Sequence, residues 1–312
     1  MKIAVMAAGG VGGYFGARLQ AAGHDVAFLA RGAHLAAIRA HGLRINSDIG
    51  DLHLTDVMAT DDSRDIGPVD IVMFAVKLWD TDASAEACRP LLGPDTAVIP
   101  FQNGVESIDT LARVLGPAHG CGGIARISAV IAEPGVIRQM GNFASLQFGE
   151  ADDRRSSRMD AFSAACERAG FPGEIVDNVR HALWEKFIFL VALSGITAAT
   201  RCAIGPIRDD VDGARMLRAV IEENAAVGRA MGVDMNPSVV ERAWTFGQKV
   251  PHDMKASMLA DLENGRRLEA PWLSGAVSRM GRELGVPTPV NDTLYAVVKP
   301  FEMGNEGRVA TT

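Results

Sequence analysis

A glycine-rich segment near the start of the chain constrains the fold more than any other feature of the sequence. Residues Lys2–Met6 form a short apolar run typical of a buried strand, and residues 11–22 repeat apolar side chains at helical spacing until Gly23. The segment between them reads Ala7-Ala8-Gly9-Gly10-Val11-Gly12-Gly13. Glycines between a strand and a helix are typical of the turn that holds a dinucleotide in a parallel α/β sheet.

This turn matches the dinucleotide-binding pattern G-x-G-x-x-G at two of its three glycines. Gly9 and Gly12 take the second and third positions, where glycine lets the backbone approach a pyrophosphate and lets helix and strand pack closely. Ala7 takes the first position, where the tight turn favours glycine. A turn without a ligand is the alternative, but the flanking strand and helix favour a cofactor. The expected cofactor-binding residues of the turn are Ala7, Ala8, Gly9, Gly10, Val11 and Gly12.

The residue after the next expected strand, Asp25–Leu29, bears on the choice between NAD and NADP. Enzymes that use NAD usually place an acid about 20 residues beyond the turn, where it binds the ribose hydroxyls. This chain has Arg31 there, and a guanidinium suits a 2′-phosphate. A solvated loop arginine is the alternative. We expect NADPH/NADP as the cofactor.

Strands alternate with helices in the first half, which predicts a parallel sheet covered by helices. Strands are expected at Lys2–Met6, Asp25–Leu29, 69–76 and 96–101, with paired strands at 43–46 and 52–55 and helices at 11–22, 33–40 and 105–115. The β-rich residues 120–148 predict antiparallel strands that extend this sheet. A helix at 158–169 and a short strand at 174–176 complete the first domain.

The second half is almost wholly helical in its periodicity. Helices are expected at Val179–Thr200, 213–231, 237–248, 254–264, 271–284 and 291–298. The fold class is therefore α/β plus all-α, with an N-terminal Rossmann-type NADP-binding domain (residues 1–174) and a C-terminal helical substrate or catalytic domain (residues 175–312). The polar tail, residues 301–312, is expected to fray.

Composition narrows the partners and the compartment. The formal net charge of −7 leaves no basic excess to neutralise phosphates, which argues against a nucleic-acid partner. The first residues do not suggest a signal peptide, and no stretch approaches the roughly 20 apolar residues that span a membrane. The longest apolar stretch, residues 187–196, suits a buried helix. The four cysteines are far apart, which predicts no metal site and the reduced thiols of a cytoplasmic protein.

Three polar residues are candidates for the chemistry. Lys77 and Asn103 each follow an expected strand, and ligands bind at the carboxyl ends of strands in a parallel sheet. Each is more often an ordinary loop residue when taken alone. Lys186 leads into the apolar stretch 187–192, where a lysine either extends its amine to solvent or is held in a cleft with a lowered pKa. The residue types alone favour the solvent-directed lysine.

Together these segments resemble the ketopantoate reductase (2-dehydropantoate 2-reductase) family over nearly the whole chain. The resemblance rests on the glycine turn, Arg31, residues 75–77, 102–104 and 184–186, and the pair Ser257 and Glu269. It implies reduction of a 2-oxo acid by NADPH in a cleft between a Rossmann domain and a helical domain, within pantothenate biosynthesis.

The resemblance also implies roles for individual residues. Lys186 would be the catalytic lysine, which donates a proton to the ketone oxygen as hydride arrives. Glu269 would accept the distal hydroxyl of the substrate or help to hold Lys186. Asn103 and Lys77 would line the nicotinamide and the substrate, and Ser257 would help to bind the carboxylate.

Two departures from the family put the substrate in question. Leu190 and Ser194 stand one and two helical turns after Lys186, where the family carries asparagines that bind ketopantoate. The segment after Glu269, Ala270-Pro271-Trp272, also differs and places a tryptophan near the implied site.

Three functions therefore remain open. Reduction of ketopantoate is the default, and a paralogous enzyme for a more apolar oxo or hydroxy acid is the main alternative. A dinucleotide-binding sensor without catalysis is less favoured, because a sensor needs no proton donor. A small-molecule 2-oxo acid is the expected partner, and the apolar helices of the second half are compatible with a homodimer.

Overall fold

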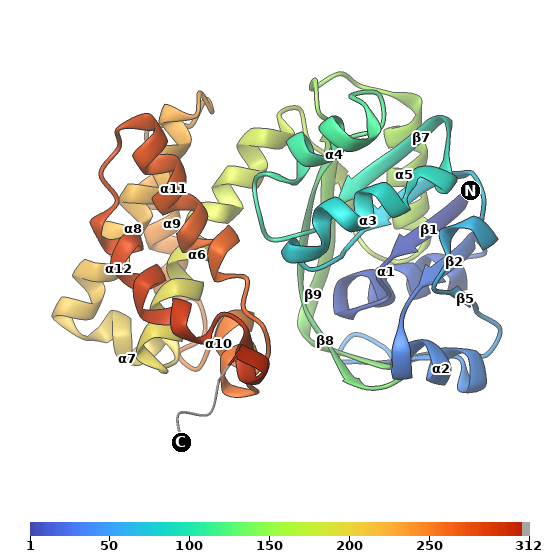
Figure 1. Cartoon of the computed structure of the whole chain (residues 1–312), viewed down its shortest axis with the longest axis horizontal. Helices are drawn as coiled ribbons and strands as arrows, with labels where there is room; N and C mark the ends of the chain where they lie inside the picture. Colours follow the sequence, from blue (N-terminus) through green and yellow to red (C-terminus); the bar gives the residue numbers. More distant parts are fainter. Residues whose placement is uncertain (308–312) are drawn as a thin grey trace. The chain divides into compact units, whose positions relative to one another are not determined.

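The computed structural model describes residues 1–307, which divide into two compact units (Figure 1). The first unit consists of Met1–Gln102 and Glu106–Arg180. The second consists of Asn103–Val105 and the described chain from His181 onward. The sequence placed the boundary between residues 174 and 175, whereas the division lies slightly later, inside helix α6 (Val179–Thr200), and assigns Asn103–Val105 to the second unit.

The first unit contains the expected parallel sheet. Its strands, in spatial order, are β5 (Met58–Thr60), β2 (Asp25–Leu29), β1 (Lys2–Met6), β6 (Val69–Phe74) and β7 (Leu92–Pro100). The helices along this part of the chain are α1 (Gly10–Ala21), α2 (Gly32–His41), α3 (Thr81–Ala87) and α4 (Ser107–Leu115). The chain adds strands on one side of β1 and then, from β6 onward, on the other. The carboxyl ends of β1 and β6 therefore flank the switch point, where open α/β sheets bind ligands.

Both faces of this sheet are buried, as its apolar strands predict. Alternate residues of β1 point to opposite faces, so Ile3 and Val5 join the apolar cluster that contains α1 and α5 (Ser157–Arg168). Ala4 and Met6 join the cluster formed with side chains of α3 and α4. Each face is thus covered by its own helices.

The prediction that residues 120–148 extend the first sheet is wrong. Most of these residues belong to a second sheet, formed by β10 (Gly173–Ile175), β9 (Val136–Glu150), β3 (Leu43–Ser47) and β4 (Leu52–Leu54), with β8 (Cys121–Glu133) paired to β9. A single bridge between Val98 and Gly120 joins the start of this segment to β7. The physical reason is the parallel pairing of β3 with β9, which directs their apolar side chains onto α1.

Helix α1 lies between the two sheets, which explains its unusual glycine content. A Cβ at Gly12 or Gly16 would lie within 2.8 Å of Val5 in β1, and one at Gly13 would lie 3.1 Å from Ile137 in β9. Small residues on both sides let the helix approach both sheets. The cost of glycine inside a helix is offset by this close packing.

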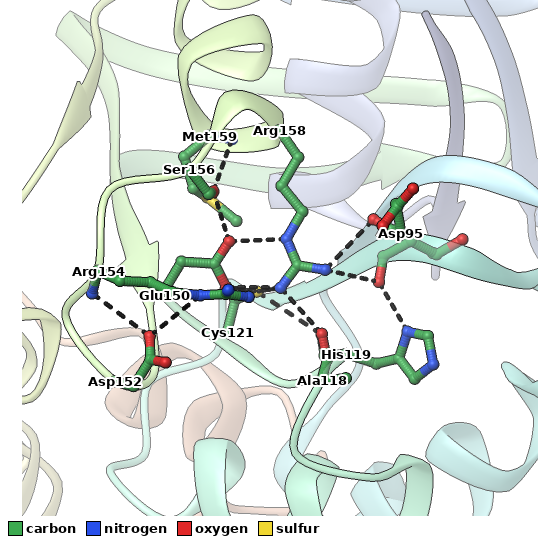
Figure 2. A network of polar contacts seen from close by, with 11 residues as sticks. Asp95, Ala118, His119, Cys121, Glu150, Asp152, Arg154, Ser156, Arg158 and Met159 are labelled. Carbon is green, nitrogen blue, oxygen red and sulfur yellow. Dashed lines mark hydrogen bonds and ion pairs between the residues drawn. The ribbon is translucent and has the colours of Figure 1, made fainter.

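A buried ion pair joins α5 to β9 in the first unit (Figure 2). Arg158 of α5 donates two hydrogen bonds, of 2.5 and 2.7 Å, to the carboxylate of Glu150, whose side chain is 3% exposed. Ser156 donates a further bond to this carboxylate. The same guanidinium donates to the backbone carbonyls of Thr96 and Ala118. The network joins β9, α5, β7 and the segment before β8.

The second unit is helical. Besides α6 it contains α7 (Ile204–Asp209), α8 (Val211–Ala230), α9 (Val239–Lys249), α10 (Ser257–Glu263), α11 (Ser274–Leu284) and α12 (Pro289–Val298). α7 was not predicted. The helix expected at 271–284 begins only at Ser274, because a 3-10 turn at Ala270–Trp272 with Pro271 in its first positions precedes it.

The described part of the C-terminal tail contains short helices. Short 3-10 helices at Lys299–Phe301 and Gly304–Gly307 occupy part of the tail expected to fray, and residues 308–312 lie outside the described chain.

Helix α6 is the core of the second unit. Its length and composition are those of a helix that could span a membrane, with a mean hydropathy of 1.5 in its most apolar window. However, 72% of that window is buried inside the protein. Such burial is typical of a core helix. The backbone carbonyl of Ile188 accepts a hydrogen bond from Asn224, which is also bonded to Asn291. The middle of α6 is therefore tied to α8 and α12.

Candidate functional site

The carboxyl ends of four neighbouring strands form one edge of the first sheet. Backbone hydrogen bonds continue past the strand ends: Ala8 donates to Leu29, and Ala75 donates to Met6. Phe101 donates in the same way to Phe74 of β6. The glycine turn, the start of α2 and the segments after β6 and β7 therefore lie along one edge, as the sequence predicted for a parallel sheet.

The glycine turn has the geometry of a pyrophosphate site. Ala7 adopts a φ of +78°, the left-handed conformation that explains why this position usually carries glycine. Gly9 is the N-cap of α1, so no side chain bonds to the free N–H groups at the start of this helix from that position. A Cβ at Gly9 would meet no atom within 4 Å. A Cβ at Gly12 would lie 2.4 Å from the carbonyl oxygen of Ala7. The second glycine thus faces open space beside a positive helix end, and the third is needed for packing.

This difference predicts that an alanine at Gly9 lowers the affinity for the cofactor, whereas an alanine at Gly12 lowers the stability of the protein. Gly9→Ala should leave the free energy of unfolding within about 0.5 kcal/mol of wild type, because the new Cβ meets no atom of the protein. It should still weaken NADPH binding by about tenfold or more, because that Cβ enters the space beside the helix N-terminus. Gly12→Ala should instead destabilise the protein by about 1–3 kcal/mol. Titration of NADPH fluorescence and urea unfolding measure the two effects; a Gly9→Ala protein with wild-type affinity would contradict the assignment.

Two charged residues stand at the same edge. Arg31 is exposed and is the N-cap of α2, and only Ala30 separates it from the end of β2. Lys77 is exposed after β6, and its amine lies 5.6 Å from the ring centre of Trp79. Both side chains are therefore at strand ends, where a ligand would reach them.

Gln102 connects the segments after β6 and β7, a role that the sequence did not reveal. Its buried amide donates to the carbonyl of Val76 (3.0 Å) and to the hydroxyl of Thr81 (2.9 Å), and accepts from the hydroxyl of Ser107 (2.7 Å). All three bonds are made inside the protein, so the amide holds the two loops together. Only its place beside Asn103 gave a hint of this role.

In the second unit, the structure brings Lys186 and Asn103 together. The amine of Lys186 donates a hydrogen bond of 3.0 Å to Oδ1 of Asn103, 83 residues earlier in the chain. Asn103 follows the end of β7, as the sequence predicted, and it is grouped with Lys186 in the second unit. An amide oxygen at this distance orients the amine without removing its charge.

The remaining candidate residues occupy different environments in the second unit. Leu190 is half-buried and Ser194 is 1% exposed, and both follow Lys186 at four-residue spacing on α6. Ser257 is exposed at the start of α10, and Glu269 is buried directly before the 3-10 turn. In the described part of the chain, no group of three His, Cys, Asp or Glu side chains is arranged to hold a metal ion.

The sheet order and the glycine turn at the switch point define the first unit as a dinucleotide-binding domain of the Rossmann type, and the chain continues into a helical unit in which Asn103 orients Lys186. Residues 3–153 match the family described as ketopantoate reductase PanE/ApbA, and residues 178–302 match its C-terminal region. The chain belongs to this ketopantoate reductase family.

Individual relatives agree with this assignment. A 2-dehydropantoate 2-reductase of Mesorhizobium japonicum is 32% identical over 96% of this chain and 97% of its own length. The crystal structure of a PanE/ApbA family ketopantoate reductase from Ralstonia eutropha JMP134 has a TM-score of 0.88 at 35% identity, and covers 97% of this chain and 98% of its own. D-mandelate dehydrogenase, solved with NADH and anilino(oxo)acetate, has a TM-score of 0.88 at 21% identity over 97% of this chain and 98% of its own, which shows a common fold alone.

The family defines the class of reaction. Its members are NADP-dependent oxidoreductases that act on CH–OH groups, and this chain is an oxidoreductase of that class with a nicotinamide cofactor.

Proposed function

We propose that this protein reduces a 2-oxo acid to a 2-hydroxy acid with NADPH, with ketopantoate as the default substrate and Lys186 as the proton donor. The hydrogen bond between Lys186 and Asn103 carries the proposal, because it fixes an amine that the sequence alone would direct to solvent. The cytoplasmic location and the homodimer stay predictions.

The residues of the first unit fit a dinucleotide. The open space at Gly9 and the backbone N–H groups at the start of α1 would receive the pyrophosphate. Arg31 would pair with the 2′-phosphate, and Lys77 would lie toward the nicotinamide side. When bound, the reduced nicotinamide supplies the hydride that adds to the carbonyl carbon.

The residues of the second unit would manage the proton. A protonated lysine has three N–H donors, and the bond to Asn103 uses one of them. Lys186 would donate another to the ketone oxygen, stabilise the negative charge that develops there, and transfer its proton as the alkoxide forms. Ser257 would help to bind the substrate carboxylate. The buried Glu269 would accept the distal hydroxyl or help to hold Lys186.

Leu190 favours a second candidate, the reduction of a more apolar oxo acid. It stands one helical turn after Lys186 with its side chain half-buried, and it cannot form a hydrogen bond. A substrate hydroxyl opposite it would lose about 1–3 kcal/mol if left without a partner. Ser194, one turn further on, retains a hydroxyl.

A matched pair of substrates separates the two candidates. Ketopantoate and 3,3-dimethyl-2-oxobutanoate differ by one hydroxyl group, so the ratio of their kcat/KM values reports on that group alone. A higher kcat/KM for ketopantoate supports the default. Preference for the deoxy acid, together with turnover of larger apolar 2-oxo acids, would establish the second candidate instead. Leu190→Asn should raise kcat/KM for ketopantoate by about tenfold if Leu190 faces the hydroxyl.

The role of Arg31 predicts a selective loss of cofactor affinity. Arg31→Ala should weaken NADPH binding by about 10- to 100-fold, because charged hydrogen bonds contribute about 1.5–3 kcal/mol. NADH lacks the 2′-phosphate, so its affinity should change by less than about twofold. Arg44→Ala, an exposed arginine on β3, serves as the control. Equal losses of affinity for NADPH and NADH would contradict a contact between Arg31 and the 2′-phosphate.

A further inference from the structure

His34 connects three segments of the first unit. It is the third residue of α2, and its side chain is half-buried. Its Nε2 lies 2.8 Å from the carbonyl oxygen of Ala8 in the glycine turn. Its Nδ1 lies 3.0 Å from the backbone nitrogen of Gly135, in the turn between β8 and β9 that packs beside α2 (Figure 1). One imidazole therefore touches the glycine turn, α2 and the hairpin.

The two partners determine the protonation state of the ring. A backbone N–H can only donate, so Nδ1 of His34 must accept from Gly135 without a proton. The carbonyl of Ala8 can only accept, so Nε2 must carry the proton. Burial lowers the pKa of His34, and the bond to Ala8 offsets this only in part. The neutral ring, with one donor and one acceptor, is thus the form that matches both neighbours.

The two residues whose backbones bond to His34, Ala8 and Gly135, each form a second backbone hydrogen bond to a strand. The N–H of Ala8 donates to Leu29 at the end of β2, and the carbonyl of Gly135 accepts from Arg44 on β3. Gly135 has a φ of +80°, and a Cβ there would lie 3.1 Å from the Cβ of Ala37. The hairpin turn is therefore seated closely on α2. His34 is the side chain that bonds the helix to both of these fixed points.

Arg31 begins the same helical turn. It is the N-cap of α2, and its carbonyl accepts from the N–H of Leu35, so the backbone from Arg31 to His34 is a closed turn. A bond from His34 to Ala8 then sets the spacing between Arg31 and the glycine turn. NADPH would contact both points, through its 2′-phosphate and its pyrophosphate, whereas NADH would need only the second.

We propose that His34 is a positioning residue, which holds Arg31 at a fixed distance from the glycine turn and thereby sets the preference for NADPH over NADH. This inference rests on the proposed cofactor site. The imidazole acts through backbone geometry and does not itself contact the cofactor.

The test compares dissociation constants for NADPH and NADH in His34→Ala, His34→Gln and wild type, with the unfolding midpoint of each. His34→Ala should weaken NADPH by about tenfold and NADH by less than about threefold, since one buried carbonyl loses its donor. His34→Gln should retain most of the preference, because its amide can also donate to Ala8 and accept from Gly135. His41→Ala is the matched control, an exposed histidine at the end of the same helix.

Recovery in His34→Gln distinguishes positioning from a general loss of stability. Equal losses for both cofactors in His34→Ala, or a His34→Gln protein as impaired as His34→Ala, would overturn the inference. A wild-type protein that binds NADH as tightly as NADPH would contradict the role of Arg31 in the proposed function. Where wild type prefers NADPH and Arg31→Ala removes that preference, equal losses in His34→Ala would overturn the positioning role alone and leave the proposed cofactor site intact.

Discussion

Lys186→Ala should lower kcat by about a thousandfold while NADPH still binds. The ammonium both stabilises the oxyanion and supplies its proton. Its removal should therefore raise the energy of the transition state more than it weakens the binding of NADPH or of the 2-oxo acid. The cofactor-binding residues proposed here belong to the first unit, apart from Asn103, whereas Lys186 belongs to the second. The dissociation constant for NADPH should therefore change by less than about threefold.

Steady-state kinetics with a saturating 2-oxo acid, together with NADPH titration, measure this prediction. Lys249→Ala replaces an exposed lysine at the end of α9 in the same unit and serves as the control. Asn103→Ala should cause a smaller loss of kcat, because the amine would remain but lose its orientation. A Lys186→Ala enzyme with more than about a tenth of the wild-type kcat would refute the catalytic role.

Arg158→Met should destabilise the protein by about 3–5 kcal/mol, because it leaves the buried carboxylate of Glu150 without its counter-charge. The backbone carbonyls of Thr96 and Ala118 lose their donor in the same change. The double variant Arg158→Met/Glu150→Leu should recover part of this loss, since it removes the unpaired charge as well. Urea unfolding at neutral pH measures all three proteins; a single variant within about 1 kcal/mol of wild type would contradict the account.

The same pair predicts an acid-sensitive contribution to stability. Burial would raise the pKa of Glu150, but the hydrogen bonds from Arg158 and Ser156 outweigh it and hold the pKa below its ordinary value. A carboxylate with a lowered pKa in the folded state stabilises that state above the pKa of the unfolded chain. The contribution is lost as the pH falls below about 4.3 and through the folded pKa. In Glu150→Gln, the free energy of unfolding should fall less steeply over this acid range.

The spacing of apolar residues along the sequence correctly predicted helices and strands that are defined by residues close together in the chain. Lys2–Met6 and Val179–Thr200 have the bounds expected from their apolar spacing. The second sheet was missed because it depends on the parallel pairing of β3 with β9, residues about ninety positions apart, which no local pattern encodes.

The same limit applies to the site. Gly9, Gly12 and Arg31 could be proposed as cofactor-binding residues because the turn and the strand end are defined by sequence position. Lys186 became a catalytic candidate only through the family resemblance, since its residue type alone suggested a solvent-directed lysine. The roles of Gln102 and His34 depend on backbone atoms of distant segments, so only the folded chain reveals them.

The stoichiometry of NADPH consumption and hydroxy-acid formation by the purified protein tests the central claim most directly. With ketopantoate, or with the apolar 2-oxo acid that it prefers, the wild-type protein should oxidise one NADPH for each 2-hydroxy acid formed, and Lys186→Ala should show almost no turnover. NADPH binding without consumption, across ketopantoate and the apolar acids alike, would contradict the reductase and support a dinucleotide-binding sensor.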